Sequence, residues 1–268
     1  MAQSANIVQL KPRTLQAFES YIREAEDAME PSLHGRGAFL WSDGNPERSQ
    51  QVRQGQIVAQ LWSGDGPVKV SNGLIHDWIG AAFVPATSVE QTLALVQNYD
   101  NHKNIYKPEV IDSKLISHDG NDYQIFLRLL KKKVITVVLD TDHDVHYSAL
   151  DEKRWTCRSY TTRIAEVEDA GTPKEKVLEP DTGYGFLWRL YSYWKFEEKK
   201  GGVGIAGERP TSARGGDGVY LECRAISLTR DIPLGLGWII EPIIRKLPQE
   251  SLIHTLEATR QGLRAAPP

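Results

Sequence analysis

The feature that most constrains the fold is a long helical pattern at the end of the chain, placed after a succession of strand-like segments. Apolar residues recur at helical spacing from Leu236 to about Leu263. Pro242 and Pro248 fall inside this pattern, and each removes a backbone donor. We therefore expect one long terminal helix with a kink or break, placed at Pro248.

The sequence pattern of the region before this helix is typical of an antiparallel sheet. A short helical segment at Ser88–Tyr99 interrupts the strands, and Ser88 can cap it. The strand-like segments are Leu74–Val84, Val110–Ser117, Tyr123–Leu130, Val134–Asp140, Trp155–Val167, Phe186–Glu197 and Val219–Leu228. Strands joined by hairpins pair in antiparallel fashion. The sequence therefore predicts an α+β fold, with a curved antiparallel β-sheet wrapped around a long C-terminal helix.

The first 73 residues differ from the rest in composition. A helix is expected from about Pro12 to Glu30, and Pro31 is expected to end it. Turn-forming residues then dominate, with short strand-like runs at Ala38–Trp41, Gln56–Trp62 and Val68–Val70. We interpret residues 1–73 as an N-terminal extension of one helix and short strands, packed on a main domain that spans residues 74–268.

The charge balance and cysteine content exclude several classes of protein. The 32 Lys and Arg residues against 35 Asp and Glu residues give a formal charge of −3, without the basic surplus of nucleic-acid binders. No apolar run reaches the roughly 18–20 residues of a membrane span. Cys157 and Cys223 lie on strands that we expect residues 186–197 to separate, so we predict no disulfide between them.

The compartment and the assembly state are not fixed by these patterns. The residues after Met1 include neither a basic patch nor an apolar stretch of the kind that a leader contains. We therefore expect a cytoplasmic protein, or an exported one whose leader was removed before residue 1. The sequence leaves the oligomeric state open.

Several local stretches resemble those of the START-like superfamily, whose members are also called SRPBCC or helix-grip proteins. The stretches are His76–Gly80, Gln97–His102, Phe186–Trp194, Val219–Cys223 and Leu228–Pro233, and they look most like a bacterial branch of the superfamily. The resemblance covers residues 74–264 and implies a helix-grip fold related to the polyketide cyclases. Because the superfamily holds lipid carriers, hormone receptors, cyclases and oxygenase subunits, the resemblance alone does not fix the function.

A cavity between the sheet and the terminal helix is the expected binding site, since a curved sheet that grips one helix leaves space for an apolar ligand. We predict that the chain binds a small hydrophobic or amphipathic molecule there, such as a lipid or a polyketide-like compound, without catalysis, cofactor or metal. The predicted wall residues come from both layers: Trp78, Trp188, Arg189, Tyr191 and Tyr193 from the sheet, and Leu236, Ile240, Ile243 and Leu247 from the helix.

Two other functions remain open. A cyclase- or dehydratase-type enzyme would need a carboxylate or a histidine with a displaced pKa inside the same cavity, and Glu222 and His102 are the candidates. An assembly protein would have a filled cavity, with residues 1–73 covering it or joining another chain.

Two segments resemble functional motifs, a metal-binding cluster and a dinucleotide-binding run, but we interpret both as structural. The segment Asp140–His146 holds three aspartates and two histidines, which can ligate a divalent cation, but we interpret it as a solvated turn or edge region. In a strand, Asp140, Asp142 and Asp144 would share one face and His143 the other. The Gly-x-Gly-x-x-Gly run at residues 202–207 precedes no helix, so we interpret it as a hairpin loop.

Arginines recur at strand positions, namely Arg128, Arg158, Arg189 and Arg224. We interpret them as part of a solvated convex face. If they were buried, they would need paired carboxylates and would indicate an anionic ligand head group.

Overall fold

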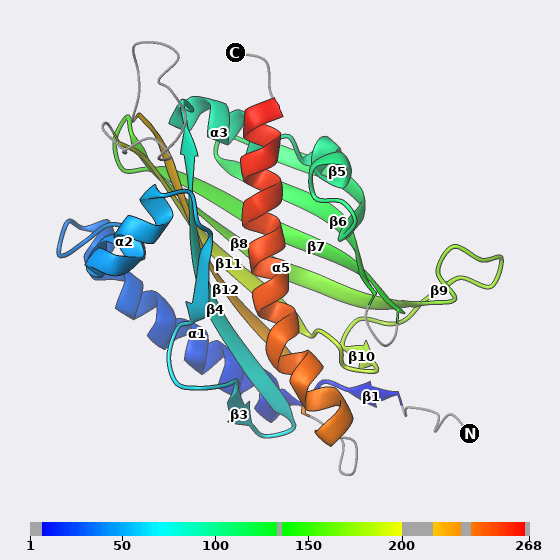
Figure 1. Ribbon diagram of the computed structural model, residues 1–268. Helices are drawn as coiled ribbons and strands as arrows, with labels where there is room; N and C mark the ends of the chain where they lie inside the picture. Colours follow the sequence, from blue (N-terminus) through cyan, green and yellow to red (C-terminus); the bar gives the residue numbers. More distant parts are fainter. Residues whose placement is uncertain (1–6, 133–135, 200–216, 232–236, 266–268) are drawn as a thin grey trace.

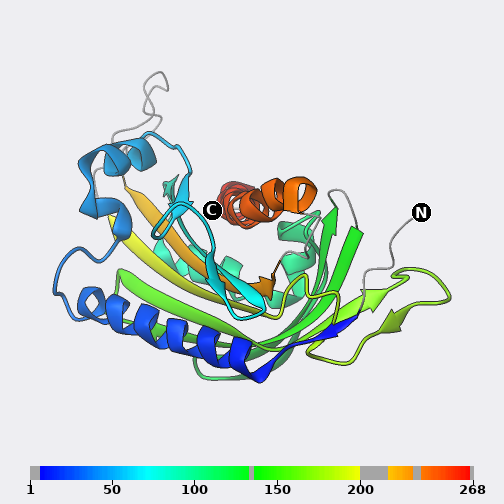
Figure 2. The same ribbon diagram turned by 90° about the horizontal axis from the view of Figure 1, so that it is seen from below.

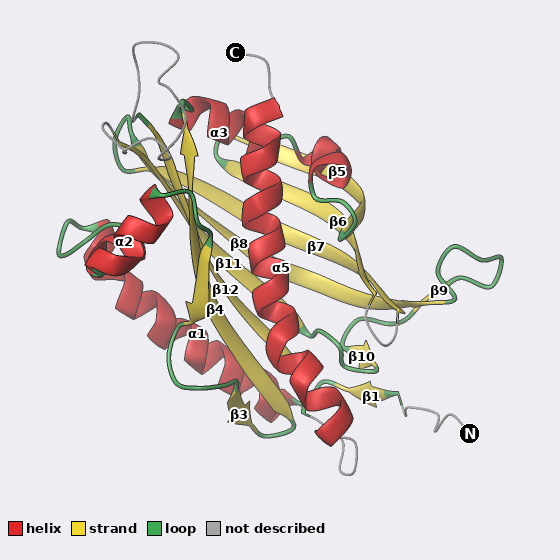
Figure 3. Ribbon diagram, viewed as in Figure 1, coloured by secondary structure: helices red, strands yellow, loops and turns green. Residues whose placement is uncertain are grey.

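The computed structural model is organised around one large, strongly curved antiparallel sheet (Figures 1 and 3). Its strands follow the order β2-β4-β12-β11-β8-β7-β6-β5, with β3 paired to β4 and β9 paired to β8. A separate two-stranded sheet joins β1 to β10. The structure describes residues 7–132, 136–199, 217–231 and 237–265, and the side chains of residues 237–245 are outside the description.

The strands and helices have the following bounds. The strands are β1 Val8–Gln9, β2 Val58–Leu61, β3 Val68–Val70, β4 Gly73–Pro85, β5 Val110–Asp119, β6 Asp122–Lys132, β7 Thr136–Ala149, β8 Arg154–Glu168, β9 Lys176–Val177, β10 Thr182–Gly183, β11 Arg189–Lys199 and β12 Gly218–Arg230. The helices are α1 Pro12–Leu33, η1 Trp41–Gly44, α2 Pro46–Arg53, α3 Val89–Val96, η2 Tyr99–Asn101, α4 His102–Ile105 and α5 Gly237–Ala265.

Helix α5 lies against the concave face of the sheet (Figure 2). Its buried residues Leu252, Leu256 and Leu263 join one apolar cluster with residues of β4, β7, β8, β11 and β12. Gly80 permits close approach, because a Cβ atom there would lie 2.8 Å from Cδ1 of Leu256. The α+β helix-grip architecture that the sequence predicts is thus confirmed. No helix of the described residues is long and apolar enough to cross a membrane.

Helix α1 lies against the opposite, convex face (Figure 2). Phe18, Ile22 and Ala25 recur at helical spacing, and all three are buried in a cluster with residues of β4 and β12. Next to this cluster, Phe39, Leu40 and Val52 pack against the convex side of β4 and β12. The N-terminal segments therefore cover one part of the sheet that α5 does not touch.

Some predicted elements differ from the observed ones. Helix α1 continues through Pro31 to Leu33, and residues 38–41 form no strand but lead into η1 and α2, which the sequence analysis missed. Strand β7 runs on to Ala149, well past the predicted end at Asp140. Of the expected kink or break in α5, the break is absent, because the helix runs without interruption through Pro248, and its axis bends along its length (Figure 1). Packing of α5 on the sheet supports the helix on the C-terminal side of that proline.

Candidate functional site

The structure places three of the predicted wall residues on the convex face, away from α5. Trp188, Tyr191 and Tyr193 all pack in the cluster around α1, and the ring of Tyr191 meets the ring of Phe18 edge-on at 5.2 Å. Arg189 donates to the carboxylate of Asp181, with 2.6 Å between Nη1 and Oδ1. The prediction that these side chains face the terminal helix is therefore corrected. For Tyr191 and Tyr193, alternation along the strand cannot show which face a helix from elsewhere will cover. Trp188 precedes the start of β11 at Arg189, so the alternation of the strand does not place it.

The other predicted wall residues divide into two groups. Trp78 lies on the concave face in the same cluster as Leu252 and Leu256. Leu247 of α5 is half-buried. Leu236, Ile240 and Ile243 lie outside the residues whose side chains the structure describes, so their place in the wall stays a prediction.

Two neighbouring rows of side chains cross the middle of the concave face. The sheet register gives the first row as Trp78, Ala225, Ser192, Ser159, Val145 and Tyr123, and the second as His76, Ser227, Leu190, Thr161, His143 and Ile125. We use the name central band for the seven inner residues Ala225, Ser192, Ser159, Ser227, Leu190, Thr161 and His143. Most of the central band consists of small side chains.

Parts of the central band are only partly buried, although the band lies in the interior of the sheet. Ser159, Leu190, Ser192 and Ala225 keep intermediate exposure. Leu190 joins none of the apolar clusters that the described residues form. The next row of the sheet on the Trp78 side consists of Cys223, Trp194, Cys157 and Tyr147. In that row Cys157, Cys223 and Tyr147 are buried in the apolar cluster that includes Leu252 and Leu256 of α5. The described side chains therefore fill the space over the band less completely than the space next to it.

His143 is the only member of the central band that can titrate. Its Nδ1 atom lies 3.2 Å from Oγ of Ser159, and its Nε2 atom lies 2.9 Å from Oγ1 of Thr141. Burial, with a smaller contribution from His102, lowers the pKa of His143 to about 4. The ring is therefore neutral at pH 7, and one of its nitrogens donates while the other accepts.

Trp78, at the end of the first row, carries an unused hydrogen-bond donor. Its side chain is 8% exposed, and Nε1 is buried without an acceptor among the described residues. A buried donor that lacks a partner costs about 1–3 kcal/mol. An acceptor brought by a ligand would recover part of that free energy.

Glu222 and His102, the candidates for acid–base chemistry, are not brought together. Glu222 lies on the convex side of β12 and accepts hydrogen bonds from the backbone N–H groups of Trp41 and Ser42 at 2.9 and 3.2 Å. Burial raises the pKa of Glu222 to about 7. His102 lies on α4 and contacts the carbonyl oxygen of Val96 at 3.0 Å, and burial lowers its pKa to about 4. Each group has a structural partner of its own.

The acidic segment Asp140–His146 lies inside β7, between β6 and β8, and not in a turn or at a sheet edge. Its aspartates share the convex face, as expected for a strand. Asp140 forms a bidentate ion pair with Arg128, with N–O distances of 2.7 and 2.9 Å. Among the described residues, no group of three His, Cys, Asp or Glu side chains is placed to hold a metal ion. The Gly-rich run at 202–207 lies outside the described residues.

The arginines do lie on the convex side, but not all of them are solvated. Arg158 is exposed, whereas Arg224 is buried and pairs with Asp77, with N–O distances of 2.9 and 2.6 Å. Tyr21 of α1 donates to the same Asp77 at 2.8 Å. The paired carboxylate that burial requires is therefore supplied by the protein and not by a ligand.

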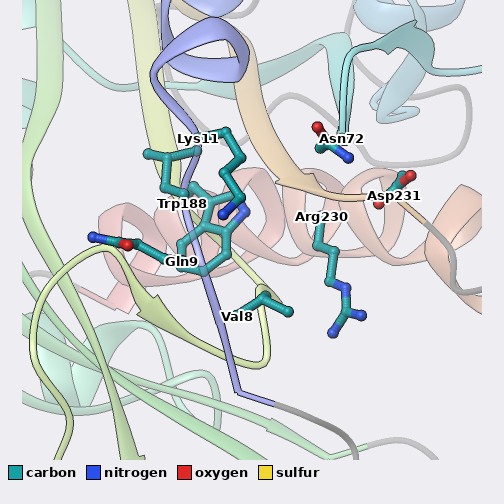
Figure 4. Close-up of a pocket in the computed structure, with 8 residues that line it drawn as sticks. Val8, Gln9, Lys11, Asn72, Trp188, Arg230 and Asp231 are labelled. Carbon is teal, nitrogen blue, oxygen red and sulfur yellow. The ribbon is translucent and has the colours of Figure 1, made fainter.

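A small pocket lies near the end of β12, apart from the central band (Figure 4). It has a volume of about 130 Å³ and includes Trp188, the only predicted wall residue there. The other lining residues are Val8, Gln9, Leu10, Lys11, Asn72, Arg230 and Asp231. Pockets for drug-sized ligands usually measure about 300–1,000 Å³. This one is too small to hold such a molecule.

Cys157 and Cys223 are both free thiols, as predicted. Strand β11 lies between β8 and β12, and Trp194 pairs with Cys157 on one side and with Cys223 on the other. The two cysteines are therefore next-nearest neighbours across the sheet, at a separation of roughly 9–10 Å.

Several solved structures resemble this chain at low sequence identity. A STAR-related lipid transfer protein from Xanthomonas axonopodis is 15% identical, over 75% of this chain and 98% of that chain, with a TM-score of 0.46. Human STARD10 is 10% identical over 73% and 72% of the two chains, with a TM-score of 0.41. The Zhui aromatase/cyclase from Streptomyces sp. R1128 is 9% identical over 71% and 94%, with a TM-score of 0.41. No family model and no curated protein matches the chain.

Proposed function

We propose that the protein binds a small hydrophobic or amphipathic molecule between the concave face of the sheet and α5, and that the central band forms the floor of this site. The supporting observation is the partial exposure of Ser159, Leu190, Ser192 and Ala225 in the interior of a sheet, next to a row in which Cys157, Cys223 and Tyr147 are buried and Trp194 packs against the α5 cluster. Small side chains there leave room that large ones would occupy.

The surrounding side chains suit an apolar guest. Trp78, Val145 and Ile125 flank the central band and are buried in the α5 cluster. Apolar surface that a ligand buries against them would contribute roughly 25 cal/mol per Å², before the free-energy cost of association. Neither of the named acid–base candidates supports the cyclase-type alternative at this site, because Glu222 lies on the other face of the sheet and His102 of α4 contacts the carbonyl oxygen of Val96.

A fluorescence titration with N-phenyl-1-naphthylamine, an uncharged apolar probe, tests the proposal on the full chain. The wild-type protein should bind the probe saturably, with one site per chain. Ser192→Trp should reduce the affinity at least tenfold, because the indole would fill the space over the central band. Ser148→Trp, which makes the same change on the convex side of β7, should bind as the wild type does.

The result can contradict the proposal in two ways. The absence of saturable binding by the wild-type protein would reject it. So would a folded Ser192→Trp variant, verified by circular dichroism and thermal melting, that binds the probe with unchanged affinity.

A further inference from the structure

The two rows that cross the middle of the concave face contain no Asp, Glu, Lys or Arg. Their twelve residues are apolar, hydroxyl-bearing or aromatic, and the titratable ones are His76, His143 and Tyr123, whose pKa burial raises above its ordinary value of 10. Burial lowers the pKa of His76 to about 4, as it does for His143. Both rings are therefore neutral at pH 7, and the floor of the proposed site has no formal charge.

The same strands carry several charged side chains on their other face. Glu222 and Arg224 of β12 point away from the central band, as do Arg158 of β8 and Lys195 of β11. The buried members have protein partners: Arg224 pairs with Asp77, and Lys195 donates to Ser32 Oγ and Phe39 O, both at 2.7 Å. These groups cannot reach through the sheet to neutralise an ionic ligand.

Two of the described charged residues on the concave side of the sheet, Lys131 and Glu166, already have partners within the protein. Lys131 pairs with Glu109 and also donates to Ser251 of α5. Lys131 is six positions along β6 from Ile125 of the second row, a separation of roughly 20 Å at about 3.3 Å per residue. Glu166 accepts from the backbone N–H groups of residues 184–186 at 2.7–3.1 Å.

Neutral hydrogen-bonding groups, in contrast, are present at the band itself. Ser159 and Ser192 are cross-strand neighbours, and both stay partly exposed. The neutral ring of His143 contacts the Ser159 hydroxyl. Nε1 of Trp78 is buried and donates to no described residue. A hydroxyl can donate and accept, so Ser159 and Ser192 beside the neutral His143 ring can satisfy one uncharged oxygen. Trp78, on β4 at the end of the row, offers a separate donor.

On the basis of the function proposed above, we infer that the ligand is an uncharged molecule with a hydroxyl or carbonyl oxygen, and that this oxygen binds at the central band. A carboxylate or phosphate at the central band would meet no counter-ion among the described residues of the two rows, and burying an unpaired charge is far more costly than burying a neutral oxygen with a hydrogen-bond partner. The site therefore selects neutral alcohols or ketones over fatty acids and anionic lipids.

Competition between two twelve-carbon compounds tests this inference. Dodecan-1-ol and dodecanoate have the same chain length and differ in charge at pH 8, and each is used to displace N-phenyl-1-naphthylamine from the full-length protein. The wild-type protein should bind the alcohol at least tenfold more tightly than the carboxylate. Ser192→Lys should reverse the preference, because it places an ammonium group in the central band. Ser148→Lys, with the same change on the convex side, should retain it.

The outcomes separate this inference from the function on which it rests. Equal or tighter binding of dodecanoate by the wild-type protein would overturn the charge selectivity while the probe still binds. Failure of both compounds to displace a bound probe would also overturn it. Failure of the probe itself to bind would reject the proposed function. The wild-type comparison decides the question even if Ser192→Lys does not fold.

Discussion

The two faces of β12 show opposite ways of covering a sheet. On the convex face, Glu222 and Arg224 are buried beneath the N-terminal segments, and each has a fixed polar partner. On the concave face, Cys223, Ala225 and Ser227 alternate with them and are all uncharged. Specific polar contacts therefore fix the side chains on the convex face of β12 in place. The concave side of β12 offers uncharged side chains, and Ala225 in its middle stays partly exposed, which suits the ligand proposed above.

The largest effect is expected from breaking the polar contacts of the convex face. Arg224→Leu would leave the Asp77 carboxylate buried with Tyr21 as its remaining side-chain partner. Removing one member of a buried ion pair typically costs about 3–5 kcal/mol. Urea denaturation should show a loss of that size in the free energy of unfolding.

A matched control for Arg224→Leu lies in the same sheet row. Arg158 is also an arginine on the convex side, two strands away, but it is exposed. Arg158→Leu should therefore change the free energy of unfolding by about 0.5 kcal/mol or less. If both variants lost the same free energy of unfolding, the buried Arg224–Asp77 pair would not be what stabilises the convex face.

The packed part of the concave face should give the next largest effect. Leu256 is completely buried between α5 and the sheet, so Leu256→Ala should cost about 3 kcal/mol through lost burial and a new cavity. Ile253 of the same helix is 36% exposed, and Ile253→Ala should cost clearly less. Equal losses in urea denaturation would show that α5 is not anchored through Leu256.

A smaller effect is expected where α1 meets the sheet through Glu26. The hydroxyl groups of Tyr193 and Tyr160 both donate to this carboxylate. Tyr193→Phe removes one hydrogen bond to a charged acceptor and should cost about 1.5 kcal/mol. Thermal or urea unfolding measures the loss. Binding of N-phenyl-1-naphthylamine should not change, because Tyr193 lies on the convex face, and reduced binding would contradict that separation.

A further effect is expected on the pH dependence of stability, and it is measured across a pH range and not as a loss at one pH. Burial raises the pKa of Glu222 from its ordinary value of 4.5 to about 7, so the folded protein holds a proton that the unfolded chain releases between these values. Glu222 therefore lowers stability as the pH rises from 4.5 to 7. Glu222→Gln should remove this contribution, and the difference between the wild-type and variant stabilities should flatten above pH 7. A difference that does not vary across this range would contradict the raised pKa.

Local patterns in the sequence predict much of the fold. Ser88 caps α3 and forms a capping box with Gln91, because Ser and Gln at this spacing satisfy two backbone donors. The hairpin between β5 and β6 forms at the predicted turn, where Gly120 adopts a φ of 57°. The placement of Cys157 and Cys223 on strands separated by β11 also follows from the order of the segments.

The faces of the strands were harder to predict. Tyr191 and Tyr193 were expected to face the terminal helix, but α1 covers that side of β11. No local pattern in the sequence indicates the central band as a whole, because its residues are small, common and spread over β7, β8, β11 and β12. Ser192, a small residue between Tyr191 and Tyr193, is the local signal that could have indicated it.

The sequence by itself determined the order of the elements, since helical and strand periodicities are local properties of the chain. It also determined which residues share a face of each strand, because alternation is built into an extended backbone. Only the tertiary structure decided which face meets α5 and which meets α1, and which side chains from distant strands become neighbours. Those relations depend on cross-strand register and on the packing of segments far apart in sequence, and no local pattern records them.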